Sequence, residues 1–399
     1  MKRVLVLLLV CLMAVASVSA IAETEPDPVV IAVCLPLSGT NSDSGRMGSN
    51  GAQLAVDYFN EKGGIQSLGG AQIQMELYDT TSEVDQSRAV LERALAGEGV
   101  VAAIGCGTSA ITLPAIPAAE RAQIPLITYS NAAELTNQGY QFIFSISPQA
   151  VDIGASMPTF LNWLNEEMGY SYTKVAIVYQ NNSKGISAAE GYRERAATYG
   201  LEVVYDESFE PNLTDATSIA TAIRSSGAEC IMIDAFNNDN KLIVDAMNAL
   251  NYHPLWLGVS CWTSFGEDMG DAANGMIAQG NWNYKNSTVL ASEEYVAITE
   301  RFREEYGYNM DEQCGSAFAC VELIVNALEV SGSYDPVELR DAIRNNTFDS
   351  IHQPGQVQFD ERGVNILATV GVNQWQYGEC VCVWPDELKG ADFIAPTDF

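Results

Sequence analysis

The sequence has few basic residues and almost no histidine. Of its 399 residues, 51 are Asp or Glu and only 20 are Lys or Arg, so the formal net charge is −31, and His253 and His352 are the only two histidines. A chain of this charge repels phosphate backbones, which argues against nucleic acid as a partner. Because histidine is the most frequent general acid or base, its scarcity also argues against an enzyme.

Motifs for metal and phosphate chemistry are missing as well. The sequence contains no C-x-x-C pair and no P-loop of the form G-x-x-x-x-G-K-[ST]. Eight cysteines follow residue 22, and most lie in apolar runs such as "IAVCLPL" and "AECIMID", where cysteine acts as a small hydrophobic residue. We therefore expect no metal, no cofactor, and few disulfides or none.

The first 22 residues have the pattern of an export signal. Lys2 and Arg3 precede an apolar run from Val4 to Val18, and Ala20-Ile21-Ala22 offers a small-residue cleavage site. The run is shorter than the roughly 20 apolar residues that a membrane anchor needs. We expect a signal peptide over 1–22 and a soluble, periplasmic or otherwise extracytoplasmic protein that starts near Glu23.

After the signal, apolar runs of strand length alternate with segments of helical periodicity. One series starts with the strand "VVIAVCL" at 29–35, and a second starts after the helical segment 149–169 with the strand "KVAIVYQNN" at 174–182. Repeated β-α-β order predicts parallel sheets with helices on both faces. The 377 residues after the signal are too many for one ordinary core, so the two series predict two lobes.

Three polar loops follow strands of the first series. They are "PLSGTNSDSG" at 36–45, "IGCGTSA" at 104–110 and "TYSNAAELT" at 128–136. Ligands of parallel sheets bind beyond the carboxyl ends of the strands, where helix N-termini supply free amides. These loops therefore predict a pocket for a small polar or carboxylate group.

Two other interpretations of the loop at 104–110 stay open at this point. Cys106 or Ser109 could be the nucleophile of a secreted hydrolase, although "GCGTS" is not a G-x-S-x-G elbow and both histidines are far away in the sequence. The loop could also be a tight glycine turn without any ligand.

Several longer motifs carry a resemblance to a known family. They include "IAVCLPLSG", "GAQLAVDYFNEKGGI", "VVAAIGCGTSAITLPAIPAAERAQIPLIT", "KVAIVYQNNSKG" and "PGQVQFDERG". Together they resemble the periplasmic solute-binding proteins of branched-chain amino acid ABC transporters, which have the type I periplasmic-binding-protein fold. The likeness spans nearly all of residues 29–385.

The resemblance implies an α/β architecture of two lobes, each with a parallel sheet flanked by helices, joined by three crossover hinge segments near Ser147, Asn283 and Val357. Lobe 1 would comprise 29–146 plus 285–355, lobe 2 would comprise 147–284 plus 356–385, and 386–399 would form a C-terminal tail. The lobes would close over a small amino-acid-like or carboxylate ligand.

The function implied by the resemblance is the extracytoplasmic solute-binding component of an ABC importer. Its partners would be the small organic ligand and the permease subunits in the membrane, and the protein itself would be a monomer without a cofactor. A ligand-sensing protein that serves a membrane receptor is the alternative.

The family's ligand-binding positions transfer unevenly. In the family, a hydroxyl and backbone amides of the "IG" loop bind the ligand carboxylate, and an aromatic side chain closes one side of the pocket. By this resemblance the matching residues are Thr108, Ser109, Ser130 and Asn131 in the loops and Phe318 as the aromatic wall.

Other positions depart from the family pattern. Ser44 and Lys184 stand where the family has aromatic residues, and Ser260 stands where an acid would hold the ligand ammonium, with Asp234 as a substitute acid. These departures predict a ligand with an anionic or acceptor group that faces Lys184, although a solvated surface lysine is the equally open alternative. Trp262, Phe236 and Tyr129 are either a stacking surface or core.

Overall fold

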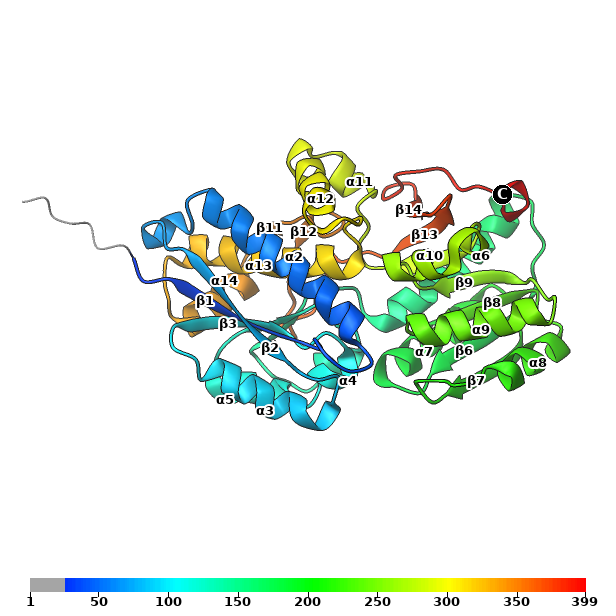
Figure 1. The fold of residues 1–399 in the computed structure, drawn as a ribbon, viewed down its shortest axis with the longest axis horizontal. Coiled ribbons are helices and arrows are strands. Elements are labelled where there is room, and N and C mark those ends of the chain that lie inside the picture. The colour runs from blue at the N-terminus through cyan, green and yellow to red at the C-terminus, as the bar shows by residue number, and fades with distance from the viewer. Residues whose placement is uncertain (1–25) are drawn as a thin grey trace, which may run out of the picture.

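The computed structural model describes residues 26–399, which form two lobes that lie side by side along the long axis of the molecule (Figure 1). Each lobe is built around one main sheet. The predicted signal peptide falls outside the described residues.

The sheet of lobe 1 has five parallel strands in the order β2-β1-β3-β4-β5. Their bounds are β1 Val29–Leu35, β2 Ile73–Asp79, β3 Val100–Gly105, β4 Leu126–Thr128 and β5 Ile143–Ser145. All residues of β1 and β3 are buried, as expected for strands that have helices on both faces.

Successive residues of β1 point into two different cores. Val29, Ile31, Val33 and Leu35 pack with α2 (Ser42–Glu61), α13 (Glu312–Ser331) and α14 (Pro336–Asn345). Val30, Ala32 and Cys34 pack with α3 (Val84–Leu95) and α5 (Ile116–Ala122) on the other face. This alternation is the two-residue period of a strand, and it fixes which helices cover which face.

The sheet of lobe 2 has seven strands in the order β14-β13-β10-β9-β8-β6-β7, and β13 and β14 are antiparallel to their neighbours. The bounds are β6 Lys174–Gln180, β7 Glu202–Phe209, β8 Cys230–Asp234, β9 Leu255–Val259, β10 Ile277–Gly280, β13 Gly371–Gln376 and β14 Glu379–Trp384. The repeated β-α-β order of the sequence thus produces parallel pairing in both lobes.

Helices also cover both faces of the second sheet. One face carries α6 (Ala150–Glu167) and α7 (Ser183–Thr198), and the other carries α8 (Thr217–Ser226), α9 (Asn237–Ala249) and α10 (Thr263–Met269). The helices α6 and α7 touch at Gly154, where a Cβ would come within 2.0 Å of the Ala188 carbonyl oxygen. Only glycine permits so close an approach of two helix backbones.

The chain passes between the two sheets three times: between β5 and α6, after β10, and between β12 (Gln356–Val357) and β13. The last crossing is later than the sequence predicts. The backbone of Ser145 in β5 still pairs with Gly363 at 2.8 Å and with Asn365 at 3.1 Å. Lobe 1 therefore extends beyond residue 355, because this loop continues the lobe 1 sheet before the chain turns away.

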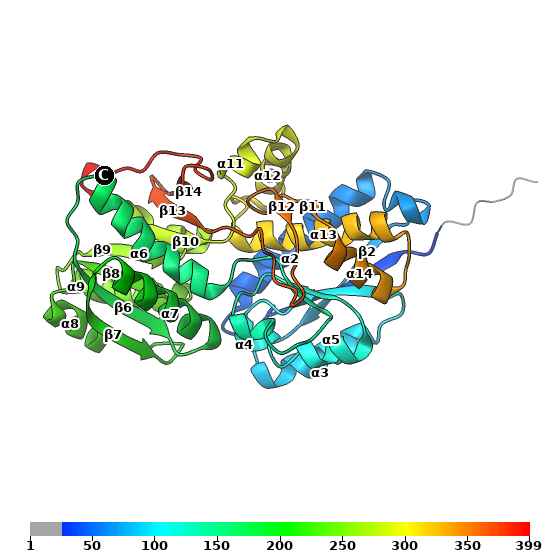
Figure 2. The same cartoon turned by 180° about the vertical axis from the view of Figure 1, so that it is seen from behind.

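Three further elements complete lobe 1. The helices α11 (Ser287–Leu290) and α12 (Glu293–Tyr306) follow the second crossing, and β11 (Phe348–Asp349) pairs with β12. In Figures 1 and 2, α11 and α12 lie next to β13 and β14 on the same side of the molecule. The predicted C-terminal tail packs on lobe 2, where the ring of Phe393 lies 5.8 Å from that of Phe160.

The helix α13 is long and apolar enough to cross a membrane, but most of it is buried inside lobe 1. It is a core helix by packing. The eight cysteines among the described residues are all buried and unpaired, so burial accounts for their apolar sequence contexts.

Candidate functional site

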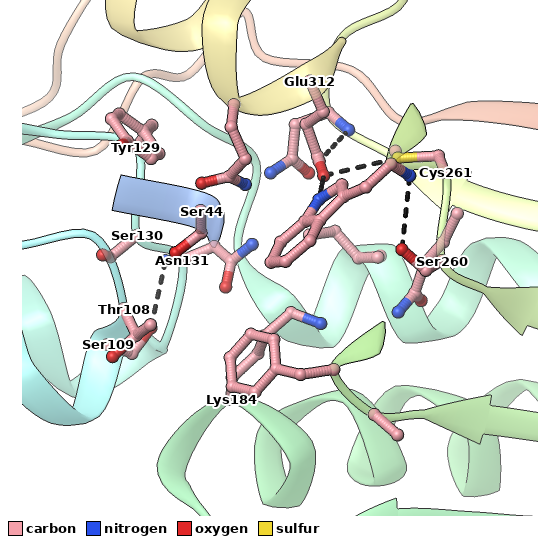
Figure 3. Close-up of a pocket in the computed structure, with 18 of the residues that line it drawn as sticks. Ser44, Thr108, Ser109, Tyr129, Ser130, Asn131, Lys184, Ser260, Cys261 and Glu312 are labelled. Carbon is pink, nitrogen blue, oxygen red and sulfur yellow. Dashed lines mark hydrogen bonds between the residues drawn. The ribbon is translucent and has the colours of Figure 1, made fainter. Parts of the chain in front are cut away.

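A cavity lies between the two lobes, at the carboxyl ends of strands from both sheets (Figure 3). The space open to the centre of a water molecule is about 70 Å³. This is a small space, which suits a compact solute or the compact end of a larger one. We call it the inner chamber.

The lobe 1 wall consists of hydroxyl and amide groups from two neighbouring loops. Ser109 begins α4 (Ser109–Thr112), and its Oγ accepts hydrogen bonds from the backbone amides of Asn131 at 3.3 Å and Ala132 at 3.1 Å. Thr112 Oγ1 lies 3.2 Å from Ser130 Oγ and ties the same two loops together. These bonds hold the wall in one geometry, and the Ser109 hydroxyl hydrogen remains able to donate to a ligand.

Two more lobe 1 side chains reach the inner chamber. Ser44, in the first turn of α2, donates its hydroxyl to the Asn41 carbonyl at 2.9 Å. Tyr129 is 5% exposed, and its hydroxyl is buried without a hydrogen-bond partner among the described residues. This hydroxyl lies inside lobe 1, 2.5 Å from where a Cβ on Gly48 of α2 would be, so Tyr129 lines the chamber without offering its hydroxyl to a ligand.

The lobe 2 wall carries a buried ion pair. Lys184 Nζ donates to Asp234 Oδ2 at 2.6 Å, and Gln279 Nε2 donates to the same oxygen at 2.7 Å. The Lys184 side chain is 23% exposed, while that of Asp234 is 3% exposed. The lysine therefore presents its charge to the inner chamber with a carboxylate already beside it.

Glu312 connects the two lobes. This first residue of α13 belongs to lobe 1, and its Oε2 accepts hydrogen bonds from Trp262 Nε1 at 3.3 Å and Cys261 Sγ at 3.4 Å. Its Oε1 accepts a bond from the backbone amide of Asn281 at 2.7 Å, in the segment after β10. Because one carboxylate receives donors from across the cavity, the conformation described here is a closed one.

The family model for periplasmic binding proteins matches residues 28–374. The chain belongs to this family. It is 26% identical over 365 residues to Leu/Ile/Val-binding protein homolog 8 of Brucella abortus, a match that spans 88% of this chain and 89% of the relative. It is 22% identical over 396 residues to homolog 7 of the same organism, which spans 96% and 98% of the two chains.

Solved structures of the same fold agree with this family. The substrate-binding protein LivJ of Streptococcus pneumoniae in complex with isoleucine has a TM-score of 0.78 at 24% identity, over 89% of this chain and 98% of that one. A solute-binding protein of Rhodopseudomonas palustris in complex with 3,4-dihydroxy benzoic acid has a TM-score of 0.76 at 16% identity, over 91% and 95%. The predicted type I periplasmic-binding-protein fold is confirmed.

The folded periplasmic binding protein brings most of the predicted site residues together. Seven of the nine line the inner chamber, five from lobe 1 and two from lobe 2: Ser44, Thr108, Ser109, Ser130, Asn131, Lys184 and Ser260. Asp234 lies behind the wall, where it pairs with Lys184 and is 2% exposed. These residues lie together because all of them follow the carboxyl ends of strands.

Phe318 does not reach the cavity, contrary to the expectation of an aromatic wall. It is fully buried in the core of lobe 1, with its ring centre 6.0 Å from that of Tyr58 and 6.3 Å from that of Phe59. Almost every position of the first half of α13 is buried. Burial of the whole helix circumference explains why its sequence does not reveal which face meets the cavity. Trp262 and Phe236 line the chamber instead.

Several polar lining residues were missed by the sequence analysis, namely Gln279, Asn281, Glu312 and Gln313. Gln279 interrupts the apolar run of β10, which is a usable signal for a polar contact. Glu312 carries no such signal, because an acid in the first turn of a helix is explained by the helix dipole alone.

The geometry around Cys106 and Ser109 gives no support to the hydrolase interpretation. Cys106 is fully buried, and burial raises the pKa of its thiol well above the ordinary value. His352 is buried and His253 is exposed, and neither lines the inner chamber. No histidine therefore stands beside Cys106 or Ser109 to activate it.

Proposed function

We propose that this protein is the substrate-binding component of an ABC importer and that it captures a small solute with a carboxylate between its two lobes. The observation that carries the proposal is the inner chamber itself, with hydroxyls and amides on one wall and the Lys184–Asp234 pair on the other. The ligands in the similar solved structures, isoleucine and 3,4-dihydroxy benzoic acid, both carry a carboxylate.

We assign the two walls different roles. The loops of Ser109 and Ser130 bind the carboxylate of the ligand through hydroxyl and amide donors, and Lys184 donates to a second acceptor group. Since Asp234 compensates the lysine charge, this second contact favours an acceptor oxygen and does not demand a second negative charge.

A thermal-shift screen of amino acids and small carboxylates tests the proposal, because a ligand at concentration [L] stabilises the folded state by RT ln(1 + [L]/Kd). A hit should also reduce the radius measured by small-angle scattering as the lobes close. If no carboxylate in the screen binds and a solute without a carboxylate group does bind, the assignment is contradicted.

We further propose that the mature protein is exported and starts near Glu23. The basic start, apolar run and small-residue site of residues 1–22 support this. Mass spectrometry of the protein from the extracytoplasmic fraction should find residues 1–22 removed, and their retention would contradict export by this route.

A further inference from the structure

A second and larger cavity adjoins the inner chamber. Its space open to the centre of a water molecule is about 370 Å³, against about 70 Å³ for the inner one. The two linings share Ser44 and Thr108 of lobe 1 and Phe236 and Trp262 of lobe 2. We call this cavity the outer chamber; the four shared residues border both chambers, which are therefore neighbours between the two lobes.

The outer chamber is built from both lobes in the same way as the inner one. Asn41 and Ser82 come from loops of lobe 1, and Asn182, Asn212 and Asn237 come from segments that follow β6, β7 and β8 of lobe 2. A ligand that reaches this space would therefore also contact both lobes and favour their closure.

Its lining differs from that of the inner chamber in charge. It includes three carboxylates, Asp43, Asp239 and Asp268, and none of its lining residues is Lys, Arg or His, although Asp43 pairs with Arg46 at 2.7 Å beside the lining. Asp239 is buried and uses its oxygens on Gln180 and on the backbone of Asn212 and Leu213. Asp268 is exposed. An anionic group would be repelled from this space, whereas a donor or a cation would be attracted.

One amide in the outer chamber has an unused acceptor. Asn237 Nδ2 donates to Ser264 Oγ, and that hydroxyl donates to Asp43 Oδ2 at 2.6 Å across the lobes. The Asn237 Oδ1 atom is buried and has no hydrogen-bond partner among the described residues. Because this atom has no accessible surface, a donor in the chamber reaches it only if the Asn237 side chain turns.

We propose that the outer chamber is the second half of the ligand site and holds a neutral or cationic, hydrogen-bond-donating tail of an extended solute. The inference rests on the proposed function, in which the inner chamber binds the carboxylate end. The inner chamber is the smaller of the two, so a longer solute would extend past Trp262 and Phe236 into the outer one.

Four amino acids with the same head and different tails test this proposal by calorimetry: L-norleucine with an apolar tail, L-citrulline with a neutral donor tail, L-arginine with a cationic tail and L-glutamate with an anionic tail. We expect citrulline and arginine to bind about tenfold or more tighter than norleucine, the effect of one or two ordinary hydrogen bonds. Glutamate should bind most weakly.

Two variants separate the chambers. Ala110 lines only the outer chamber, and Ala110→Phe should reduce the advantage of citrulline and arginine to about twofold or less while norleucine binds as before. Asp268→Asn should weaken arginine about twofold to fivefold and leave citrulline unchanged, since exposed charges are well screened. Asp271→Asn is the control, because Asp271 is also exposed and lines neither chamber.

The outcomes distinguish this proposal from the proposed function. Equal affinity for norleucine, citrulline and arginine would overturn the outer-chamber site and leave the inner one standing. Binding of none of the four amino acids would overturn the outer-chamber proposal, and the carboxylate screen would then decide the proposed function separately. Tighter binding of glutamate than of arginine would show that the chamber takes anionic tails and would overturn the charge argument.

Discussion

Glu312 and Trp262 face each other across the cleft, and the carboxylate of the one accepts the indole N–H of the other at 3.3 Å. The two residues belong to different lobes. Glu312 also accepts a hydrogen bond from the Asn281 backbone amide at 2.7 Å. Hydrogen bonds to a charged group contribute about 1.5–3 kcal/mol each to the state that contains them. This carboxylate therefore closes part of the ligand-free population, and a bound ligand closes the rest.

Glu312→Gln should favour the open conformation. The variant keeps the volume of the side chain but replaces one acceptor oxygen with a donor amide. It therefore loses the hydrogen bonds made either to Oε1 or to Oε2 of Glu312. We expect ligand affinity to fall about tenfold, and the scattering radius without ligand to rise. The emission of Trp262 should change as its indole loses a charged partner.

A matched control lies on the same helix. Glu329 accepts the backbone amides of Gln66 at 2.6 Å and Ser67 at 2.8 Å, entirely within lobe 1. Glu329→Gln should affect stability alone. If both variants leave affinity and radius unchanged, Glu312 is not a closure contact.

Lys184→Gln should destabilise the folded protein because it leaves Asp234 buried without its cation. Removal of one partner of a buried pair costs about 3–5 kcal/mol, and we expect about 2–4 kcal/mol here because Lys184 is 23% exposed. The double variant Lys184→Gln with Asp234→Asn should recover most of that stability in urea unfolding. Equal loss in the single and double variants would show that the pair does not stabilise the fold.

The same two variants test the role of Lys184 toward the ligand. If the lysine only balances Asp234, the double variant should bind carboxylates as well as the unchanged protein. If it donates to the ligand, affinity stays low even after stability is recovered.

The sequence predicts the parts of the site that depend on strand ends. The loops of Ser109 and Ser130 were found because each follows a buried apolar run, and the carboxyl ends of parallel strands meet at one edge. Lys184 came from the family resemblance. The same rule places lobe 2 residues opposite lobe 1 residues only if the lobes face each other. That arrangement came from the family resemblance and not from local pattern.

The features that the sequence analysis predicted wrongly or missed depend on packing between distant segments. Phe318 lies in a helix buried on nearly all sides, where periodicity gives no direction. Glu312 has an ordinary helix-start sequence, and its partners Trp262 and Asn281 are some 30 to 50 residues away along the chain. The late third crossing depends on backbone pairing between Ser145 and residues 363–365, which no local motif encodes.

Ser109→Ala should weaken carboxylate binding by about 1–2 kcal/mol, the usual cost of a lost charge-assisted hydrogen bond. The variant should also lose roughly 1 kcal/mol of stability, because Ser109 Oγ accepts the amides of Asn131 and Ala132. Ser145→Ala is the control, since its hydroxyl donates to the Ser130 carbonyl at 2.8 Å away from the inner chamber. It should lower stability with little effect on affinity, and an equal loss of affinity in both variants would contradict a direct ligand contact.

Two buried groups of lobe 1 give stability an unusual dependence on pH. Burial raises the pKa of Glu322 from 4.5 to about 7, although Ile351 N donates to its carboxylate at 2.7 Å. Burial lowers the pKa of His352 from 6.5 to about 4. Glu322 adds to the free energy of unfolding below its unfolded pKa of 4.5, and this stabilisation is lost as pH rises through about 7. His352 adds to the free energy of unfolding above pH 6.5, and this stabilisation is lost as pH falls through about 4. Between these limits the two groups oppose each other.

Glu322→Gln should reveal this opposition. Glutamine has the same volume and can accept the Ile351 amide without a proton, so the variant and the unchanged protein should differ least near pH 4.5. The variant should gain relative stability as pH rises to about 7, by at most about 1.4 kcal/mol per pH unit. Urea unfolding at several pH values measures the difference.

Glu294→Gln is the control, because hydrogen bonds from Lys62 and Tyr58 lower the pKa of that exposed carboxylate, so its effect should be constant above about pH 5. A parallel pH profile for Glu322→Gln and the unchanged protein would mean that Glu322 ionises in the folded state as it does in the unfolded chain.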